Sequence, residues 1–337
     1  MFTQDRPYSF HIELTDKCNA ACPMCPRTDH TNHCTPDLSK VQNIELSLAD
    51  FQANFTDDFC RRVSEVDLCG SLGDPLAARD CLAICDHLTA RGVGVSISTN
   101  ASLRSTKWWT ELGRHFTRTP SHVEFHIDGL ADTNPLYRIN TSFEKIIANA
   151  AAYIATGARA EWHYILFRHN EHQVTEAQAL AKEMGFRKFV LIDTIRFGAR
   201  DRFDYQLPNG AYRSLQPSAC DGASFQTGFA ERVAEAPPPA AGDGGIVCKS
   251  AVQNRPYINC GGYVSACCWT AGSNEELLTL DHAGLRRSAF NIRHRPLSEI
   301  LAAEPFVGLF ERAWLGGANP ICQRKCGQMI RNKRYAV

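Results

Sequence analysis

Short apolar runs alternate with amphipathic stretches through the first two thirds of the chain. The runs predict six strands, at residues 8–14, 63–68, 93–98, 122–127, 160–167 and 188–192. Apolar residues at helical spacing predict the helices between them, at residues 46–62, 77–91, 143–156 and 173–184, with one more between the third and fourth strands. Strands that alternate with helices favour a parallel sheet with right-handed crossovers. Such a sheet carries its functional site at the carboxyl ends of the strands.

The regular pattern fades after Phe197, and the end of the chain has a different character. The stretch VAEAPPPAAGDGG, at residues 233–245, has the composition of a linker. Beyond it, residues 257–259 and 263–265 predict two short strands of a hairpin about the turn Cys260-Gly261-Gly262. We therefore expect an α/β domain at residues 1–195, a connecting segment and linker at 196–247, and a small cysteine-rich domain at 248–337.

The composition is that of a globular protein and excludes several functional classes. Hydrophobic residues make up 44% of the 337 residues and charged residues 21%. The 36 Lys and Arg residues balance 36 Asp and Glu residues, so the formal net charge is zero. The chain therefore lacks the overall positive charge that favours nucleic acid as a partner. No run reaches the roughly 18–20 apolar residues of a membrane span, and the N-terminus lacks a secretory signal pattern. The sequence therefore predicts a cytoplasmic protein that does not contact membranes.

Fifteen cysteines without a secretory signal favour metal ligands and buried thiols over disulfides. Cys18, Cys22 and Cys25 form a C-x3-C-x2-C motif directly after the first predicted strand. Three thiolates on one loop can bind a single soft metal centre, although a structural zinc site normally takes four protein ligands. A [4Fe–4S] cluster held by three cysteines instead leaves one iron open to a small molecule. A zinc loop, or three unrelated cysteines, is the alternative interpretation.

The motif and its position resemble those of the radical S-adenosylmethionine (radical SAM) superfamily. The resemblance implies a partial (β/α)6 TIM-like barrel and a catalytic [4Fe–4S] cluster on Cys18, Cys22 and Cys25. It further implies that S-adenosylmethionine binds the open iron and is cleaved reductively to a 5′-deoxyadenosyl radical, which removes a hydrogen from the substrate. A one-electron donor such as flavodoxin or ferredoxin would then be a partner.

The same resemblance implies cofactor contacts at the ends of the strands. Gly73 and Asp74 resemble the Gly-Gly-Glu type of motif that holds the amino group of S-adenosylmethionine, with Asp in place of Glu. Thr99-Asn100 resembles a Thr-Asn-Gly motif, with Ala101 in place of Gly. The remaining expected contacts are Met24 for the adenine, His126 and Asp128 for the ribose or the substrate, and Tyr164 or Arg168 for the carboxylate.

The cysteines near the end of the chain resemble the SPASM/twitch extension of radical SAM enzymes, which carries auxiliary [4Fe–4S] clusters. The resemblance implies one such cluster, with the ligands Cys248, Cys267, Cys322 and Cys326. A zinc site with the same four ligands is the alternative, because four thiolates suit both. Cys260 and Cys268 remain, either as buried thiols or with one of them as a catalytic thiol.

Three functions follow from these motifs. The first is a radical SAM enzyme that oxidises or epimerises a small molecule, such as a sugar or an antibiotic-type metabolite. The second is a peptide maturase, which we expect less because the first strand begins within ten residues of Met1 and leaves no room for a leader-recognition domain. The third is a non-catalytic iron–sulfur or zinc protein.

Overall fold

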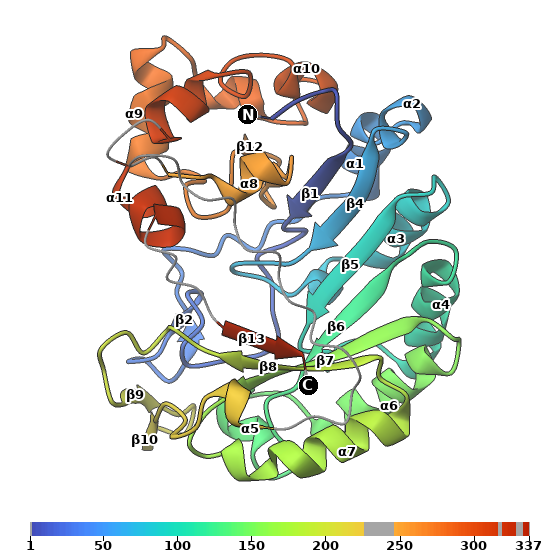
Figure 1. The fold of residues 1–337 in the computed structure, drawn as a ribbon, viewed down its shortest axis with the longest axis vertical. Helices are drawn as coiled ribbons and strands as arrows, with labels where there is room; N and C mark the ends of the chain where they lie inside the picture. Colours follow the sequence, from blue (N-terminus) through green and yellow to red (C-terminus); the bar gives the residue numbers. More distant parts are fainter. Residues whose placement is uncertain (1, 226–245, 316–318, 328–332, 337) are drawn as a thin grey trace.

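The computed structural model describes residues 2–225, 246–315, 319–327 and 333–336. Its centre is a nine-stranded sheet in the order β12-β11-β1-β4-β5-β6-β7-β8-β13 (Figure 1). Six neighbouring strands of this sheet are parallel and follow one another in chain order. They are β1 (Tyr8–Ile12), β4 (Val63–Leu68), β5 (Gly94–Thr99), β6 (His122–His126), β7 (Arg159–Leu166) and β8 (Lys188–Asp193). The predicted partial barrel is thereby confirmed.

The connecting helices lie along one face of the sheet (Figure 1). They are α1 (Leu48–Asn54), α2 (Asp57–Cys60), α3 (Cys81–Thr89), α4 (Thr106–Phe116), α6 (Phe143–Ile154) and α7 (Val174–Met184). The short helix α5 (Asn134–Tyr137) lies instead beside the loop after β1, where Tyr137 packs in one cluster with Cys22 and Met24. Ser47 begins α1 with a capping box, in which it exchanges hydrogen bonds with Asp50. The prediction of one helix over residues 46–62 was wrong, because the Thr56 hydroxyl accepts the amide of Phe59 and begins a second helix.

Successive side chains of each strand point to opposite faces of the sheet. One face is apolar and packs against the helices, and the other is largely polar and faces the inside of the partial barrel. Phe10, Val66, Ile97, Phe125 and Trp162 are fully buried against the helices. Side chains one position away face the inside, and many of them are polar. They include His11, Asp67, Ser98, Glu124, Glu161 and His163. The inner wall therefore supplies donors and acceptors rather than a hydrophobic filling.

Both edges of the six-stranded unit are extended by segments from the end of the chain. The strand β11 (Tyr257–Ile258) pairs in parallel with β1, and β12 (Val264–Ser265) returns antiparallel to β11, which confirms the predicted hairpin. At the other edge, β13 (Lys333–Ala336) pairs antiparallel with β8. The helices α8 (Lys249–Val252), α9 (Asn274–His282), α10 (Leu297–Leu301) and α11 (Pro320–Cys322) gather beside β1 (Figure 1).

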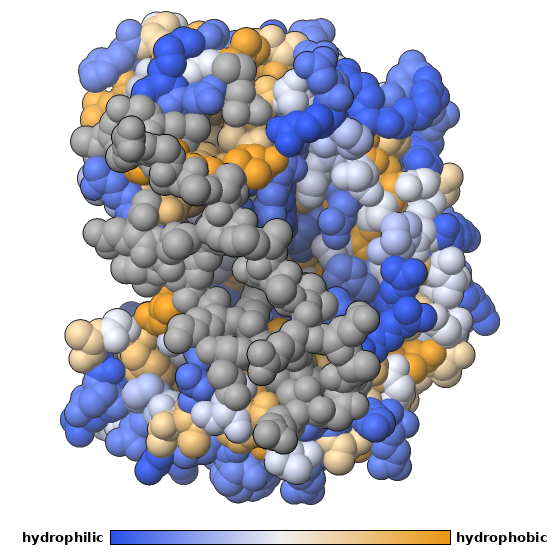
Figure 2. Space-filling view, in the orientation of Figure 1, coloured by the Kyte–Doolittle hydropathy of each residue, from blue (hydrophilic) through white to orange (hydrophobic). Residues whose placement is uncertain are grey.

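Two small hairpins complete the described structure: β2 (Thr28–Asp29) with β3 (Thr35–Pro36), and β9 (Phe203–Gln206) with β10 (Tyr212–Leu215). The expected linker at 233–245 lies outside the described residues, and the expected domain boundaries stay a prediction. On the face drawn in Figure 2, hydrophilic residues are spread over the surface and apolar residues form small groups. Among the described helices, none has the length and hydropathy needed to cross a bilayer.

Candidate functional site

The loop after β1 brings Cys18, Cys22 and Cys25 together. The amide of Cys25 donates to the carbonyl of Cys22 at 3.0 Å, which closes a tight turn. The buried guanidinium of Arg27 donates to the carbonyl oxygen of Cys18 at 3.4 Å and holds the start of the loop. Burial raises the pKa of Cys18 and of Cys22, and each of these thiols has a neighbouring cysteine of the motif that raises it further. The three expected ligands are therefore neighbours in a desolvated site.

Two nitrogen donors, one directly after β5 and one directly after α5, reach the sulfurs of this loop. The side-chain amide of Asn100 lies 3.8 Å from Sγ of Cys18, and Nη1 of Arg138 lies 3.8 Å from Sγ of Cys22. Asp128 orients Arg138 through a bond of 2.6 Å from Nε, and its charge keeps the pKa of Arg138 raised although burial opposes this. Hydrogen bonds and positive charge at the ligand sulfurs are features that tune iron–sulfur sites. The donor set fits a cluster held by three thiolates.

Asp74 ties the ends of β4 and β5 together beside this loop. Its carboxylate accepts the Thr99 hydroxyl at 2.8 Å, and the backbone and side-chain amides of Asn100 at 2.9 and 2.7 Å. A Cβ on Gly73 would lie 1.8 Å from the carbonyl oxygen of Thr15, so only glycine fits. The structure thus assembles the four expected strand-end residues. Here Asp74 positions Asn100 against Cys18, and its contact with a cofactor amino group stays a prediction.

The four expected auxiliary ligands also gather. Burial raises the pKa of Cys322 to about 12, and the charges of Cys267, Cys248 and Cys326 add to the effect. Burial likewise raises the pKa of Cys248 to about 11, with Cys267 and Cys326 as neighbours. The four thiols, all within the described part of the chain, therefore lie in one region of the structure, although no three of their sulfurs all lie within 4.8 Å of one another. Four thiolates suit an iron–sulfur cluster and zinc alike.

A cavity of about 960 Å³ connects the two groups of cysteines. Met24 and Cys25 line it, as do Cys248, Cys267, Cys322 and Cys326. Its wall also includes inward-facing residues of the sheet, among them His11, Asp67, Ser98 and Glu124. A cavity of this size holds a small molecule or a few residues of a peptide.

Several solved structures have a fold similar to that of this chain. Streptococcus suis SuiB bound to S-adenosylmethionine matches with a TM-score of 0.56 at 13% identity, over 90% of this chain and 67% of that chain. Native anSMEcpe with bound AdoMet and Cp18Cys peptide matches with a TM-score of 0.52 at 14% identity, over 95% of this chain and 86% of that chain. SuiB bound to its precursor peptide SuiA matches with a TM-score of 0.55 at 12% identity, over 90% and 66% of the two chains. This chain has the radical SAM fold. No protein-family model matches the sequence, and neither does any curated protein.

Within the radical SAM fold, Tyr164 and Arg168 lie apart from the cysteine loop. Tyr164 faces the helices, is fully buried, and donates its hydroxyl to the carbonyl of Asn170 at 2.8 Å. Arg168 is exposed and pairs with Glu171 at 3.1 Å. Strand alternation explains the difference, since His163 and Tyr164 must point to opposite faces. The structure does not bring either expected carboxylate contact to the site.

Met24 and Asp128 lie beside the cysteines, and each already has partners. The carbonyl of Met24 accepts Nη1 of Arg196 at 3.1 Å. The fully buried carboxylate of Asp128 accepts the Ile165 amide at 2.6 Å as well as the Arg138 guanidinium. Its expected ribose contact stays a prediction, and in the structure it acts through Arg138.

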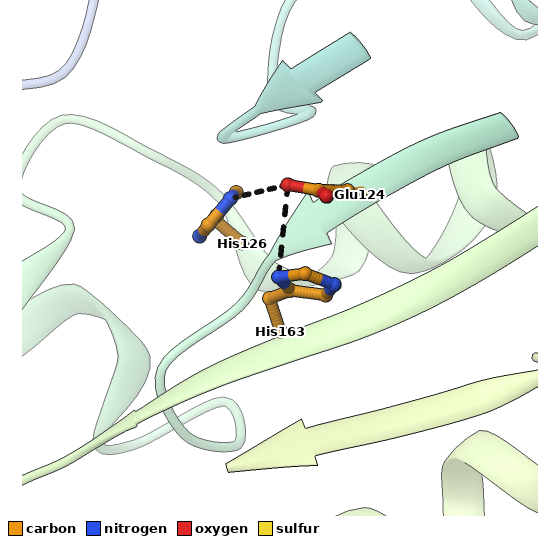
Figure 3. Close-up of side chains that lie close together, drawn as sticks. All are labelled: Glu124, His126 and His163. Carbon is orange, nitrogen blue, oxygen red and sulfur yellow. Dashed lines mark ion pairs between the residues drawn. The ribbon is translucent and has the colours of Figure 1, made fainter. Parts of the chain in front are cut away.

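His126 is part of a polar cluster on the inner wall, with Glu124 and His163 (Figure 3). Burial lowers the pKa of His126 to about 4, so its ring is neutral. Glu124 also accepts the hydroxyl of Ser98 at 2.6 Å from the neighbouring strand β5. The sequence analysis singled out His126 and passed over Glu124, which lies two residues earlier on the same face of β6. His163 becomes a neighbour of His126 only through the register of β6 and β7.

Sequence reasoning also missed Arg138 and Glu13. Arg138 follows the short helix α5, where no local pattern marks it as a partner of Cys22. Glu13 is buried and accepts the amides of Leu72 and Gly73 at 2.6 and 3.2 Å, and the hydroxyl of Tyr257 at 2.7 Å. This carboxylate therefore connects the glycine loop of the barrel to the hairpin from the end of the chain.

Tyr257→Phe is expected to lower the free energy of unfolding by about 2 kcal/mol, because it removes a buried hydrogen bond to a carboxylate. Urea denaturation of wild type and variant under the same anaerobic conditions measures the change. Tyr212→Phe is the matched control, since that ring is 76% exposed, and it should change stability by less than about 0.5 kcal/mol. Equal midpoints for the two variants would show that the Glu13 bond does not hold the hairpin to the barrel.

Proposed function

We propose that this protein is a radical SAM enzyme, with a [4Fe–4S] cluster on Cys18, Cys22 and Cys25 and S-adenosylmethionine bound beside it. The observation that carries the proposal is the pair of donors, Asn100 and Arg138, directed at two sulfurs of a three-cysteine loop at the carboxyl ends of a partial barrel. A zinc loop does not account for a three-ligand set with strand-end donors around it.

When bound, the cluster supplies the electron that cleaves S-adenosylmethionine to a 5′-deoxyadenosyl radical. The chain's own residues position the reactants and exclude water. Arg138 and Asn100 place donors at the ligand sulfurs, and Asp74 fixes Asn100. Gly73 leaves room where the backbone of the β4 loop passes Thr15. A donor such as flavodoxin or ferredoxin would deliver the electron.

The second group, Cys248, Cys267, Cys322 and Cys326, is proposed to hold one auxiliary [4Fe–4S] cluster. The shared cavity supports this proposal, because Cys248, Cys267, Cys322 and Cys326 all line it together with Cys25. A centre held by these thiols would therefore border the same cavity as the cysteine loop.

The substrate is proposed to be a small molecule that occupies this cavity. Polar side chains along the inner wall, such as His11, Asp67 and Ser98, suit a molecule rich in hydroxyl or amino groups. A peptide is the second candidate, and a specific observation favours it. Two of the similar solved structures, SuiB with SuiA and anSMEcpe with Cp18Cys, hold peptides.

The reaction is proposed to be an oxidation or an epimerisation. The two differ in the role of Cys268, which would donate a hydrogen atom only in an epimerisation. Cys268 lines the cavity, and burial raises its pKa to about 12, so the thiol keeps its hydrogen at neutral pH. Cys260 is buried in the turn of the hairpin and is not among the described residues that line the cavity. A thiol at the cavity wall can return a hydrogen atom to a substrate radical, which is the step that epimerisation needs: the S–H bond breaks and a C–H bond forms. The thiyl radical left on Cys268 would then take one electron from the one-electron donor and one proton from solvent.

Anaerobically reconstituted, reduced protein is expected to convert S-adenosylmethionine to 5′-deoxyadenosine, measured by chromatography. In deuterated water with a candidate substrate, an epimerase incorporates one solvent deuterium at the reacting carbon. Cys268→Ala should abolish this deuterium while 5′-deoxyadenosine still forms. Cys260→Ala is the matched control and should change neither.

Two outcomes would redirect the proposal. Failure of the iron-loaded, reduced protein to form 5′-deoxyadenosine would contradict a radical SAM activity. A product oxidised by two electrons, equal in both variants, would assign oxidation and leave Cys268 as a buried thiol of the cavity wall.

A further inference from the structure

We propose that Glu124, His126 and His163 bind one divalent transition-metal ion on the inner wall of the barrel (Figure 3). This site is separate from both groups of cysteines and does not rest on the proposed radical chemistry. With three protein ligands, the ion would keep open positions, and one of these would bind an oxygen or nitrogen donor of the molecule in the cavity.

The geometry of the three ligand atoms fits one ion. Oε2 of Glu124 lies 3.6 Å from Nε2 of His126 and 3.7 Å from Nδ1 of His163. All three ligand atoms lie within 4.8 Å of one another. Metal–ligand bonds of about 2.1 Å place neighbouring ligand atoms of a tetrahedral site about 3.4 Å apart. The two distances from Glu124 exceed this value by only a few tenths of an ångström, and the two histidine nitrogens lie within 4.8 Å of each other.

The hydrogen bonding of His163 supplies an independent observation. Its ring is 2% exposed, and Nε2 donates to Oε2 of Glu161 at 3.2 Å. The other ring nitrogen, Nδ1, is buried and has no hydrogen-bond partner among the described residues. It lies 3.7 Å from Oε2 of Glu124, and a cation between these two atoms would give the buried nitrogen a partner.

Glu161 completes the arrangement as a positioning residue. A histidine ligand usually donates its second ring nitrogen to a carboxylate, which fixes the ring and makes the ligand nitrogen more basic. Glu161 does this for His163, and the parallel register sets Glu124 beside Glu161 and His126 beside His163. The pairing of two strands therefore builds both the ligands and their support.

A second triple, His122 with Glu124 and Glu161, also brings ligand atoms together, but its surroundings disfavour a cation. Nζ of Lys188 lies 2.5 Å from Oε1 of Glu161 and neutralises that carboxylate. A cation at this triple would be repelled by the ammonium group. At the proposed site, both imidazoles are in place and the carboxylate of Glu124 has no lysine or arginine partner among the described ion pairs.

The ligand set also indicates the class of ion and its role. Two imidazoles and one carboxylate bind Zn(II), Fe(II) and Mn(II) with open positions. Glu124 lines the cavity, so an ion it holds would be accessible from there. Such an ion would bind a hydroxyl, carboxylate or amine of the substrate as a Lewis acid and fix its position.

The test is a titration of the full-length protein with Mn(II), after anaerobic reconstitution has saturated the cysteine sites. Loss of the electron paramagnetic resonance signal of free Mn(II) measures binding, and pulsed spectra of the bound ion report nitrogen couplings. We expect one Mn(II) per chain with couplings to two imidazole nitrogens, and displacement by Zn(II) at lower concentration. Glu124→Gln, His126→Gln and His163→Gln should each weaken binding by more than about 100-fold, since each removes a ligand rather than its support.

Two further variants sharpen the assignment. Glu161→Gln should weaken binding by about 10- to 100-fold and keep both nitrogen couplings, as expected for a positioning residue. His122→Gln, on the same strand, is the matched control and should bind Mn(II) like the wild type. The absorbance of the iron–sulfur clusters shows whether each variant is folded. If a ligand variant fails to fold, the number of imidazole nitrogens coupled to Mn(II) in the wild type tests the proposed ligands instead.

Three results would overturn the proposal. They are the absence of saturable Mn(II) binding, bound Mn(II) without two nitrogen couplings, and loss of binding in His122→Gln with retention in His163→Gln. In the first case the three side chains would be polar contacts for the substrate only.

Discussion

Replacing Cys18, Cys22 and Cys25 together by alanine is expected to remove about four irons per chain and all formation of 5′-deoxyadenosine. The three thiols share one loop, and Asn100 and Arg138 are directed at two of their sulfurs, so the variant removes every thiol of the proposed ligand set. Iron analysis and the 5′-deoxyadenosine assay of anaerobically reconstituted protein measure both losses.

The control is Cys220→Ala, which removes an exposed thiol and should leave the iron content and the activity unchanged. Circular dichroism of the triple variant establishes that the barrel still folds. Continued cleavage of S-adenosylmethionine by a folded triple variant would rule out this loop as the catalytic centre.

Replacing Cys248, Cys267, Cys322 and Cys326 by alanine is expected to lower the iron content from about eight to about four per chain. S-adenosylmethionine cleavage should persist, because the cysteine loop and its donors come from the barrel. The substrate reaction should fail, since these thiols line the cavity proposed for the substrate. Metal analysis and product analysis of the same sample separate the two effects.

The wild type provides the decisive comparison for this second site. About four irons and one zinc in reconstituted wild-type protein would identify the site as zinc and remove the redox role. A double variant of Cys60 and Cys85, two buried thiols of the barrel core, controls for the loss of cysteine itself and should keep both sites loaded.

Much of the fold follows from local pattern. Residues 63–68 were predicted as a strand and form β4, because their apolar positions alternate with polar ones. The strand β13 was not predicted, since the pairing of Lys333–Ala336 depends on the exposed edge of β8 rather than on its own residues. Likewise, the hairpin was predicted from its turn, whereas its parallel pairing with β1 depends on contacts between residues far apart in the sequence.

Some residues of the candidate site could likewise be predicted from local sequence, and others depend on contacts between distant segments. The cysteine motifs were readable because their spacing along the chain already determines which thiols can meet. Tyr164 was expected at the site, but its side chain packs toward the helices while that of its neighbour His163 faces the inside, because one residue along a strand exchanges the two faces of the sheet. Arg138 depends on its bond to Asp128, ten residues earlier, which no periodicity signals. Glu124 beside Glu161 required the register of two strands.

The parallel pairing of β11 with β1 has a consequence for synthesis of the chain. The amides of Ser9, His11 and Glu13 donate to the carbonyls of Asn254, Pro256 and Ile258. Since the ribosome releases these acceptors only after the six barrel strands, the first strand waits for most of translation with an open hydrogen-bonding edge. Such an edge is a template for pairing with other chains. Assembly of the cavity and protection of the nascent barrel from aggregation therefore depend on the same late segment.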